Sequence, residues 1–141
     1  MKMSKKKIKQ PQKDRGNKLT TPNDQKEISP EKAPPVFSLR YLEGEYCLTK
    51  CEKDDQVAFA LKLHRLSKLT WSQIHSQGRH QLGYEKISRD AIKAPIPKFI
   101  TEDVNFIAFR FSGIKAMVGY RDGAIFYVIW LDRNFTLYNH G

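Results

Sequence analysis

The dipeptide Asp122-Gly123 constrains the fold of this chain most, because it separates two runs that each read as a β-strand. Those runs are residues 116–121 and 124–131, and Asp-Gly in such a place is a strong signal for a type I′ hairpin turn. A third apolar run, residues 104–112, precedes them. The first and last of the three runs carry apolar side chains on both faces, so we expect both strands to be covered. The stretch therefore predicts an antiparallel three-stranded meander.

The residues before the meander predict one strand and two helices. Residues 36–41 alternate apolar and polar side chains, which is the pattern of a half-buried strand. An apolar stripe over 52–68 predicts a helix, and a capping box at 70–73 opens a short second helix that Gly78 closes. Two helices joined almost without a loop form an αα-hairpin. The predicted fold is α+β: an N-terminal strand, a two-helix hairpin and the antiparallel three-stranded meander, with the helices on one face of the sheet.

Positive charge is concentrated at the start of the chain. The net charge is +10, and residues 1–35 hold ten Lys or Arg against four Asp or Glu. This segment has few large apolar side chains, so it buries too little surface to offset the entropy of ordering it. We expect a disordered basic tail over residues 1–35 and one folded domain over residues 36–141. The tail reads either as a salt-sensitive nucleic-acid contact or as a solvated leader.

Composition also bounds the compartment and the cofactors. No apolar run approaches the roughly 18 residues that span a bilayer, and no apolar segment follows the basic start as in a secretory signal. We therefore expect a soluble, cytoplasmic protein without a membrane partner. Cys47 and Cys51 form a lone C-x3-C spacing with no second pair, which is a poor zinc signal. The expectation is reduced thiols, no metal site and no cofactor.

A few residue types in the second half of the chain suit cleavage of RNA without a metal. That reaction needs groups that move protons, for which His and Glu are suited near neutral pH. It also needs Arg to hold the phosphate and its developing charge, and Tyr to stack on a base or donate a hydrogen bond. By spacing alone, an Arg in a strand is more often structural and a C-terminal Tyr-Asn-His is more often a solvated end, so the spacing favours the structural reading. The candidate catalytic residues are His140, Arg133, Tyr138, Arg110 and Glu85, and the candidate substrate-binding residues are Arg121, His80, Arg79 and Lys86.

Residues 36–141 resemble the RelE/ParE-type toxins of bacterial type II toxin–antitoxin systems, in particular the ParE-like toxins. The resemblance rests on the order strand, helix, helix, meander. It also rests on the run Phe-Arg-Phe-Ser-Gly-x-x-x-Met-Val-Gly-Tyr-Arg-Asp-Gly at 109–123 and on the ending Trp-Leu-Asp-Arg-Asn-Phe-Thr-Leu-Tyr-Asn-His at 130–140. Members of this superfamily usually lack a long basic leader, so residues 1–35 depart from the pattern.

The resemblance implies roles for individual residues. One branch of the superfamily cleaves messenger RNA, usually in the ribosomal A site and without metal, and the other poisons DNA gyrase. Carried over, Arg110 falls on a phosphate-binding strand Arg, and Arg133 falls on an Arg that stabilises the transition state. Tyr138 and His140 fall on the stacking and acid–base positions, and Glu85 falls loosely on a general-base Glu.

His140 favours the ribonuclease branch, because a gyrase poison has no need of an imidazole at the end of the sheet. The resemblance also implies two partners, a cognate antitoxin protein that covers this surface and messenger RNA on the ribosome. Two alternatives stay open. One is a non-enzymatic toxin whose partner is DNA gyrase, and the other is a basic nucleic-acid-binding module that acts mainly through residues 1–35.

Overall fold

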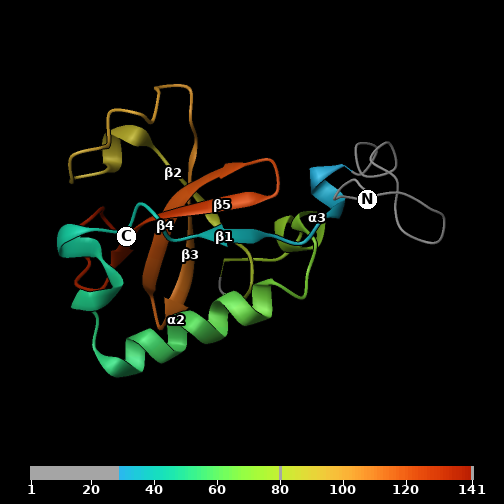
Figure 1. The fold of residues 1–141 in the computed structure, drawn as a ribbon, viewed down its shortest axis with the longest axis horizontal. Coiled ribbons are helices and arrows are strands. Elements are labelled where there is room, and N and C mark those ends of the chain that lie inside the picture. Colours follow the sequence, from blue (N-terminus) through green and yellow to red (C-terminus); the bar gives the residue numbers. More distant parts are fainter. Residues whose placement is uncertain (1–28, 80, 141) are drawn as a thin grey trace, which may run out of the picture.

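The structure is a computed structural model that describes residues 29–79 and 81–140. In this part of the chain a five-stranded mixed sheet, in the order β1-β5-β4-β3-β2, forms the centre (Figure 1). Its strands are β1 (Val36–Ser38), β2 (Glu85–Ile87), β3 (Phe106–Ser112), β4 (Lys115–Asp122) and β5 (Ile125–Asp132). The α-helices are α2 (Lys53–Leu66) and α3 (Trp71–His75), and short 3-10 turns are η1 (Pro30–Lys32), η2 (Gly44–Tyr46), η3 (Leu48–Lys50) and η4 (Arg89–Ala91). The described chain is α+β, as predicted.

The sheet is larger than the sequence predicted. Strands β3, β4 and β5 pair in sequence order and antiparallel, but they form the middle of the sheet and not the whole of it. β1 adds to one edge by running parallel to β5, and β2 adds to the other edge by running antiparallel to β3. The prediction of a three-stranded meander with a separate strand is therefore corrected. β2 was missed because three residues of mixed charge and polarity carry almost no periodic signal.

The turn between β4 and β5 lies one residue later than predicted. Asp122 pairs with Ile125, so the two turn residues are Gly123 and Ala124. Among them only Gly123, at φ 63°, has a positive φ. A positive φ at the first turn residue alone is the pattern of type II′, whereas type I′ needs two such residues. The type I′ prediction was wrong, although the hairpin itself lies where Asp-Gly placed it.

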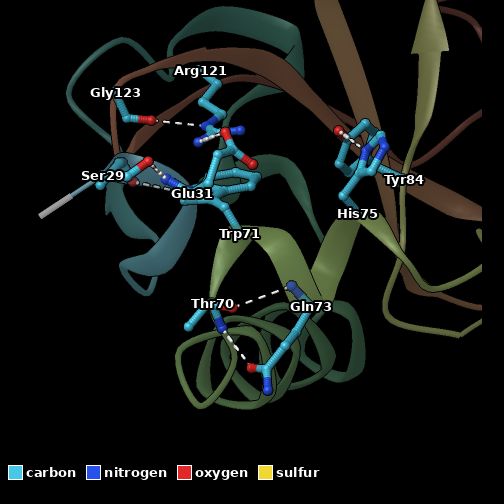
Figure 2. A network of polar contacts seen from close by, with 10 residues as sticks. Ser29, Glu31, Thr70, Trp71, Gln73, His75, Tyr84, Arg121 and Gly123 are labelled. Carbon is cyan, nitrogen blue, oxygen red and sulfur yellow. Dashed lines mark hydrogen bonds and ion pairs between the residues drawn. The ribbon is translucent and has the colours of Figure 1, made fainter.

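The predicted two-helix hairpin is also corrected. The capping box that opens α3 is present, with Gln73 N 3.2 Å from Thr70 Oγ1 and Thr70 N 2.9 Å from Gln73 Oε1 (Figure 2). However, α3 has only five residues and is fixed elsewhere. The indole of Trp71 is completely buried and donates from Nε1 to the carbonyl of Ala124 at 2.9 Å. α3 is thus a short connector anchored to the end of the sheet and not the second arm of a hairpin.

The predicted basic tail overlaps the folded part. Residues 1–28 of that tail lie outside the described residues. Residues 29–35 pack on the body: the backbone N–H of Trp71 donates to the carbonyl of Ala33 at 3.0 Å, and Glu31 on η1 makes an ion pair with Arg121. The assignment of residues 29–35 to a disordered tail was therefore wrong. The missed signal is local, since Ser29 caps a turn that Pro30 opens.

The two faces of the sheet are covered differently. On one face α2 and α3 bury a core that includes Phe59, Trp71, Phe109 and Phe126. On the other face, within the described chain, residues 88–104 and the segment after β5 take the place of helices. Their side chains pack on a second core, whose members include Ile100, Phe106, Val118, Trp130, Leu137 and Tyr138. We call these the helix face and the loop face.

Candidate active site

Three polar residues from distant parts of the sequence lie on the loop face. Arg110 on β3 pairs with Ala116 on β4, and Ala116 pairs with Asp132 on β5. Arg110, Ala116 and Asp132 therefore form one row across the sheet. Glu85 on β2 pairs with Ala108, which is two residues before Arg110 and therefore shares its face. Ala108 and Ala116 both belong to the second core. The sheet register thus places Glu85, Arg110 and Asp132 together.

Asp132 fixes the segment that follows β5. Its side chain is completely buried. Oδ1 accepts hydrogen bonds from the backbone N–H of Thr136 at 2.9 Å and of Leu137 at 3.1 Å. Phe135, which lies between Asp132 and Thr136 in the chain, has a φ of 60°, a left-handed value that costs a non-glycine residue about 1 kcal/mol or more. The buried carboxylate therefore holds a strained turn that returns the last residues over the sheet.

The imidazole of His140 is held by three side chains. Its Nε2 lies 2.6 Å from Asp132 Oδ2. Its ring stacks on Tyr138, with centroids 4.1 Å apart and planes at 21°, and meets Phe135 edge-on at 5.0 Å. Because an ionised carboxylate can only accept, Nε2 carries the hydrogen, and Nδ1 is then the basic nitrogen of the neutral ring. A carboxylate that orients one imidazole nitrogen and leaves the other to exchange protons is the arrangement that acid–base catalysis by histidine uses.

Tyr138 lies at the centre of these groups. The pKa of its phenol is raised to about 12, mainly by burial and also by the negative charges of Glu85 and Asp132, against the positive charges of Arg110 and Arg79. The phenol is therefore neutral at physiological pH and can donate a hydrogen bond. Only 4% of the Tyr138 surface is exposed, and one face of its ring is stacked on His140. The ring is therefore not open for stacking on an RNA base. The predicted role as an open base platform would need this ring to move.

Arg79, in the loop after α3, adds a solvent-exposed cation beside Glu85. Its Nη1 donates to Glu85 Oε2 at 3.0 Å, and the two side chains are 47% and 31% exposed. The charges of both side chains act on the pKa of Tyr138, Glu85 raising it and Arg79 lowering it. We call the resulting group the loop-face cluster; it consists of Arg79, Glu85, Arg110, Asp132, Tyr138 and His140.

The structure separates the remaining candidates from this cluster. Arg133 turns toward η2, where its Nη1 donates to the carbonyl of Glu45 and its Nη2 lies 3.4 Å from the Glu45 carboxylate. Lys86 pairs with Ile107 and Arg121 pairs with Phe126, and both of those partners belong to the core of the helix face. His80 lies outside the described residues. Five of the nine predicted site residues thus come together: Arg79, Glu85, Arg110, Tyr138 and His140.

Asp132 is the member of the cluster that the candidate list lacked. Acidic residues at the end of a strand are common, so its position alone carries little information. The usable signal was the eight-residue spacing to His140, since a tight turn after β5 brings a carboxylate and an imidazole together. Only the fold shows that the turn exists and that it encloses Phe135.

Three further findings concern metal ions, membrane-spanning helices and similarity to known proteins. Within residues 29–79 and 81–140, no group of three His, Cys, Asp or Glu side chains has an arrangement that could hold a metal ion. The helices in the described ranges are too short or too polar to cross a membrane. Comparison of the chain with family models, with curated proteins and with solved structures gave no match in any of the three.

Proposed function

We propose that this chain is a toxin of a bacterial type II toxin–antitoxin system, of the RelE/ParE type, that cleaves messenger RNA without a metal ion. The observation that supports the proposal best is the loop-face cluster. It combines an oriented imidazole, a half-exposed carboxylate and two arginines on one sheet face. The order β1, α2, α3 and then β3 to β5 also agrees with the superfamily pattern, with β2 as an addition.

The arginines would bind the scissile phosphate. Arg110 lies in the sheet row of Asp132, and Arg79 lies beside Glu85 at the solvent side. Guanidinium groups bind phosphate oxygens in pairs and stabilise the extra negative charge of the pentacovalent transition state. Binding of a phosphate would compete with Glu85 for Arg79 and would free that carboxylate.

Glu85 and His140 would move the two protons. In one assignment Glu85 takes the proton of the 2′-hydroxyl, whose oxygen attacks the adjacent phosphorus. His140, protonated at Nδ1, gives its proton to the departing 5′-oxygen. The P–O5′ bond breaks as the P–O2′ bond forms, so the products are a 2′,3′-cyclic phosphate and a free 5′-hydroxyl. The buried carboxylate of Asp132 would keep the imidazole oriented.

Arg133 has no catalytic role in this proposal. The resemblance placed it on a transition-state arginine, but its guanidinium is engaged by Glu45 on η2. Its position suits a structural role, because it ties the end of β5 to the 3-10 turn that packs beside it.

The proposed function implies specific partners and a cellular compartment. The substrate is messenger RNA on the ribosome, the inhibitor is a cognate antitoxin that covers the loop face, and both reside in the cytoplasm. Co-expression of an adjacent small open reading frame that encodes such an antitoxin should restore growth. A growth arrest that no neighbouring gene relieves would remove this part of the proposal.

A cleavage assay on programmed ribosomes tests the proposed function. Purified protein should cut the message within the A site, and Glu85→Gln should lower the rate by about 10²- to 10⁴-fold, as expected for loss of a proton-transfer group. Lys86→Gln is the matched control, because Lys86 is the next residue on β2 and faces the other side. A supercoiling assay with purified gyrase runs in parallel. Intact message together with inhibited gyrase would replace the ribonuclease by a gyrase poison.

A further inference from the structure

A hollow on the helix face contains two of the predicted cations that the loop-face cluster leaves out, Lys86 and Arg121. Its volume is about 370 Å³, and its lining includes Tyr84, Lys86, Asn105, Ile107 and Arg121. Pockets for small molecules have volumes of roughly 300–1,000 Å³. The hollow is therefore large enough for a small ligand, and its cations, Lys86 and Arg121, lie on the opposite face of the sheet from Arg110 and Asp132.

The guanidinium of Arg121 is fixed in place before any ligand arrives. Its Cζ lies 4.3 Å from the centre of the buried Trp71 ring, and its Nε donates to the carbonyl of Gly123 at 2.8 Å (Figure 2). A guanidinium held over an indole face loses little side-chain entropy when it binds an anion. Its side chain remains 22% exposed, so solvent-borne groups can reach it.

The protein already places an anion on this arginine. Glu31, on the 3-10 turn η1, lies with Oε2 2.5 Å from Arg121 Nη2 (Figure 2). The Glu31 side chain is 54% exposed, so water can take its place at little cost. Exposed ion pairs contribute little to stability, and a dianionic phosphate is a stronger ligand for arginine than a carboxylate. Glu31 thus marks an oxyanion position that another anion can occupy.

Lys86 supplies a second positive charge on the same face. It pairs with Ile107, which pairs with Gly119, and Gly119 is two residues before Arg121 on β4. Lys86 is exposed and lines the hollow with Arg121. The one carboxylate in the lining, that of Asp103, accepts a hydrogen bond from Thr101 Oγ1. The hollow therefore has two cations and the one carboxylate, an amide on Asn105 and an apolar floor.

We propose that this hollow binds a small phosphorylated molecule of nucleotide size, with its phosphate on Arg121 and Lys86 and with Glu31 as an internal competitor. The apolar side chain of Ile107 and the ring of Tyr84 would contact the organic part of the ligand, and the amide of Asn105 would bind its polar edge. The site is independent of the proposed ribonuclease function, because it lies on the opposite face of the sheet. Failure of one would leave the other standing.

Titration with adenosine monophosphate tests the site in the full-length protein. The indole N–H of Trp71, which donates to Ala124, is a direct reporter in a two-dimensional amide spectrum because Arg121 stacks on its ring. Adenosine monophosphate should shift this signal saturably. Inorganic phosphate should compete for the same site, and adenosine without phosphate should leave the signal in place. No shift at millimolar nucleotide, or an equal shift with adenosine, would overturn the proposal.

Variants assign the binding to the named side chains. Lys86→Gln and Arg121→Gln should each weaken binding by about tenfold or more, the loss expected for a charge-assisted hydrogen bond. Glu31→Gln should tighten it, because it removes the competing carboxylate. Arg110→Gln, on the opposite face, should bind like the wild type. Unchanged affinity in Lys86→Gln, which is exposed and does not endanger folding, would contradict the assignment, as would binding of an RNA oligonucleotide without binding of the mononucleotide.

Discussion

The imidazole Nε2 of His140 lies 2.6 Å from the carboxylate Oδ2 of Asp132, and the Asp132 side chain is completely buried. This contact closes the segment after β5 over the sheet, and it orients the one imidazole of the loop-face cluster. Structure and proposed chemistry depend on the same carboxylate. Substitutions that remove it and substitutions that keep its shape should therefore have different effects.

Asp132→Ala should destabilise the protein by about 3 kcal/mol, because it leaves two backbone N–H groups and the imidazole without their buried acceptor. Asp132→Asn retains one oxygen for the turn and should cost clearly less. Urea denaturation followed by circular dichroism measures both. Equal losses in the two variants would contradict the role of Oδ1 as the acceptor for the Thr136 and Leu137 amides.

Gly119→Ala should prevent stable folding or destabilise the protein by about 3 kcal/mol. A Cβ on Gly119 would lie 1.8 Å from the carbonyl oxygen of Tyr127, at the position where the register of β4 and β5 shifts. Gly78→Ala is the matched control, because a Cβ there meets nothing within 4 Å. Thermal unfolding of the two variants makes the comparison. A Gly119→Ala protein as stable as Gly78→Ala would mean that the bulge is absent.

Lys62 should make stability rise with pH in the alkaline range. It is buried on α2 with its Nζ 2.9 Å from the carbonyl of Gln81, and burial lowers its pKa from 10.5 to about 8, with a smaller effect of Arg65. Below pH 8 the amine is charged in both states and its burial is costly. Between pH 8 and 10.5 only the unfolded chain keeps the proton, so the free energy of unfolding increases by on the order of 2–3 kcal/mol.

Lys62→Met isolates this contribution from other groups that titrate in the same range. The variant should be at least as stable as the wild type at neutral pH, and it should lack the alkaline rise that the wild type shows. Urea denaturation of both proteins at a series of pH values gives the difference. Parallel stability curves for the two proteins would show that Lys62 does not titrate in this range.

Arg133→Ala should retain cleavage activity and growth arrest, although the resemblance assigned this residue to the transition state. Its guanidinium contacts Glu45 and does not lie in the sheet row of Arg110 and Asp132. The expected effect is a small loss of stability, since the Glu45 side chain of this ion pair is 74% exposed. Loss of cleavage in a folded Arg133→Ala protein would restore the sequence-based role and would require the Glu45 contact to break on binding.

Long apolar runs were the part of the fold that the sequence predicted well. The strands around Asp122-Gly123 and the helix ending near Leu66 were found from periodicity, because many residues contribute to each pattern. β1 and β2 have three residues each, and their pairing depends on distant partners at the edges of the sheet. The place of α3 depends on contacts of Trp71 with residues far away in the sequence, Ala33 and Ala124. Such long-range contacts leave no local signal.

The candidate site, like the fold, was only partly predictable from the sequence. Residue types that suit phosphate chemistry could be named from the sequence, but which of them share a face depends on strand register. Arg110 and Arg121 look alike in the sequence, and the register sends one to the loop face and the other to the stacking position on Trp71. Glu85 and Lys86 are neighbours that point to opposite faces for the same reason.

The most direct test of the central claim measures the cut ends of a message incubated with ribosomes and with one of three proteins: the wild type, His140→Ala or Arg110→Gln. The wild type should leave fragments that end in a 2′,3′-cyclic phosphate, and His140→Ala and Arg110→Gln, with folding confirmed by circular dichroism, should cut about 10²-fold more slowly or worse. Intact message with the wild type, or undiminished cutting in both variants, would contradict the assignment of the loop-face cluster as a ribonuclease active site.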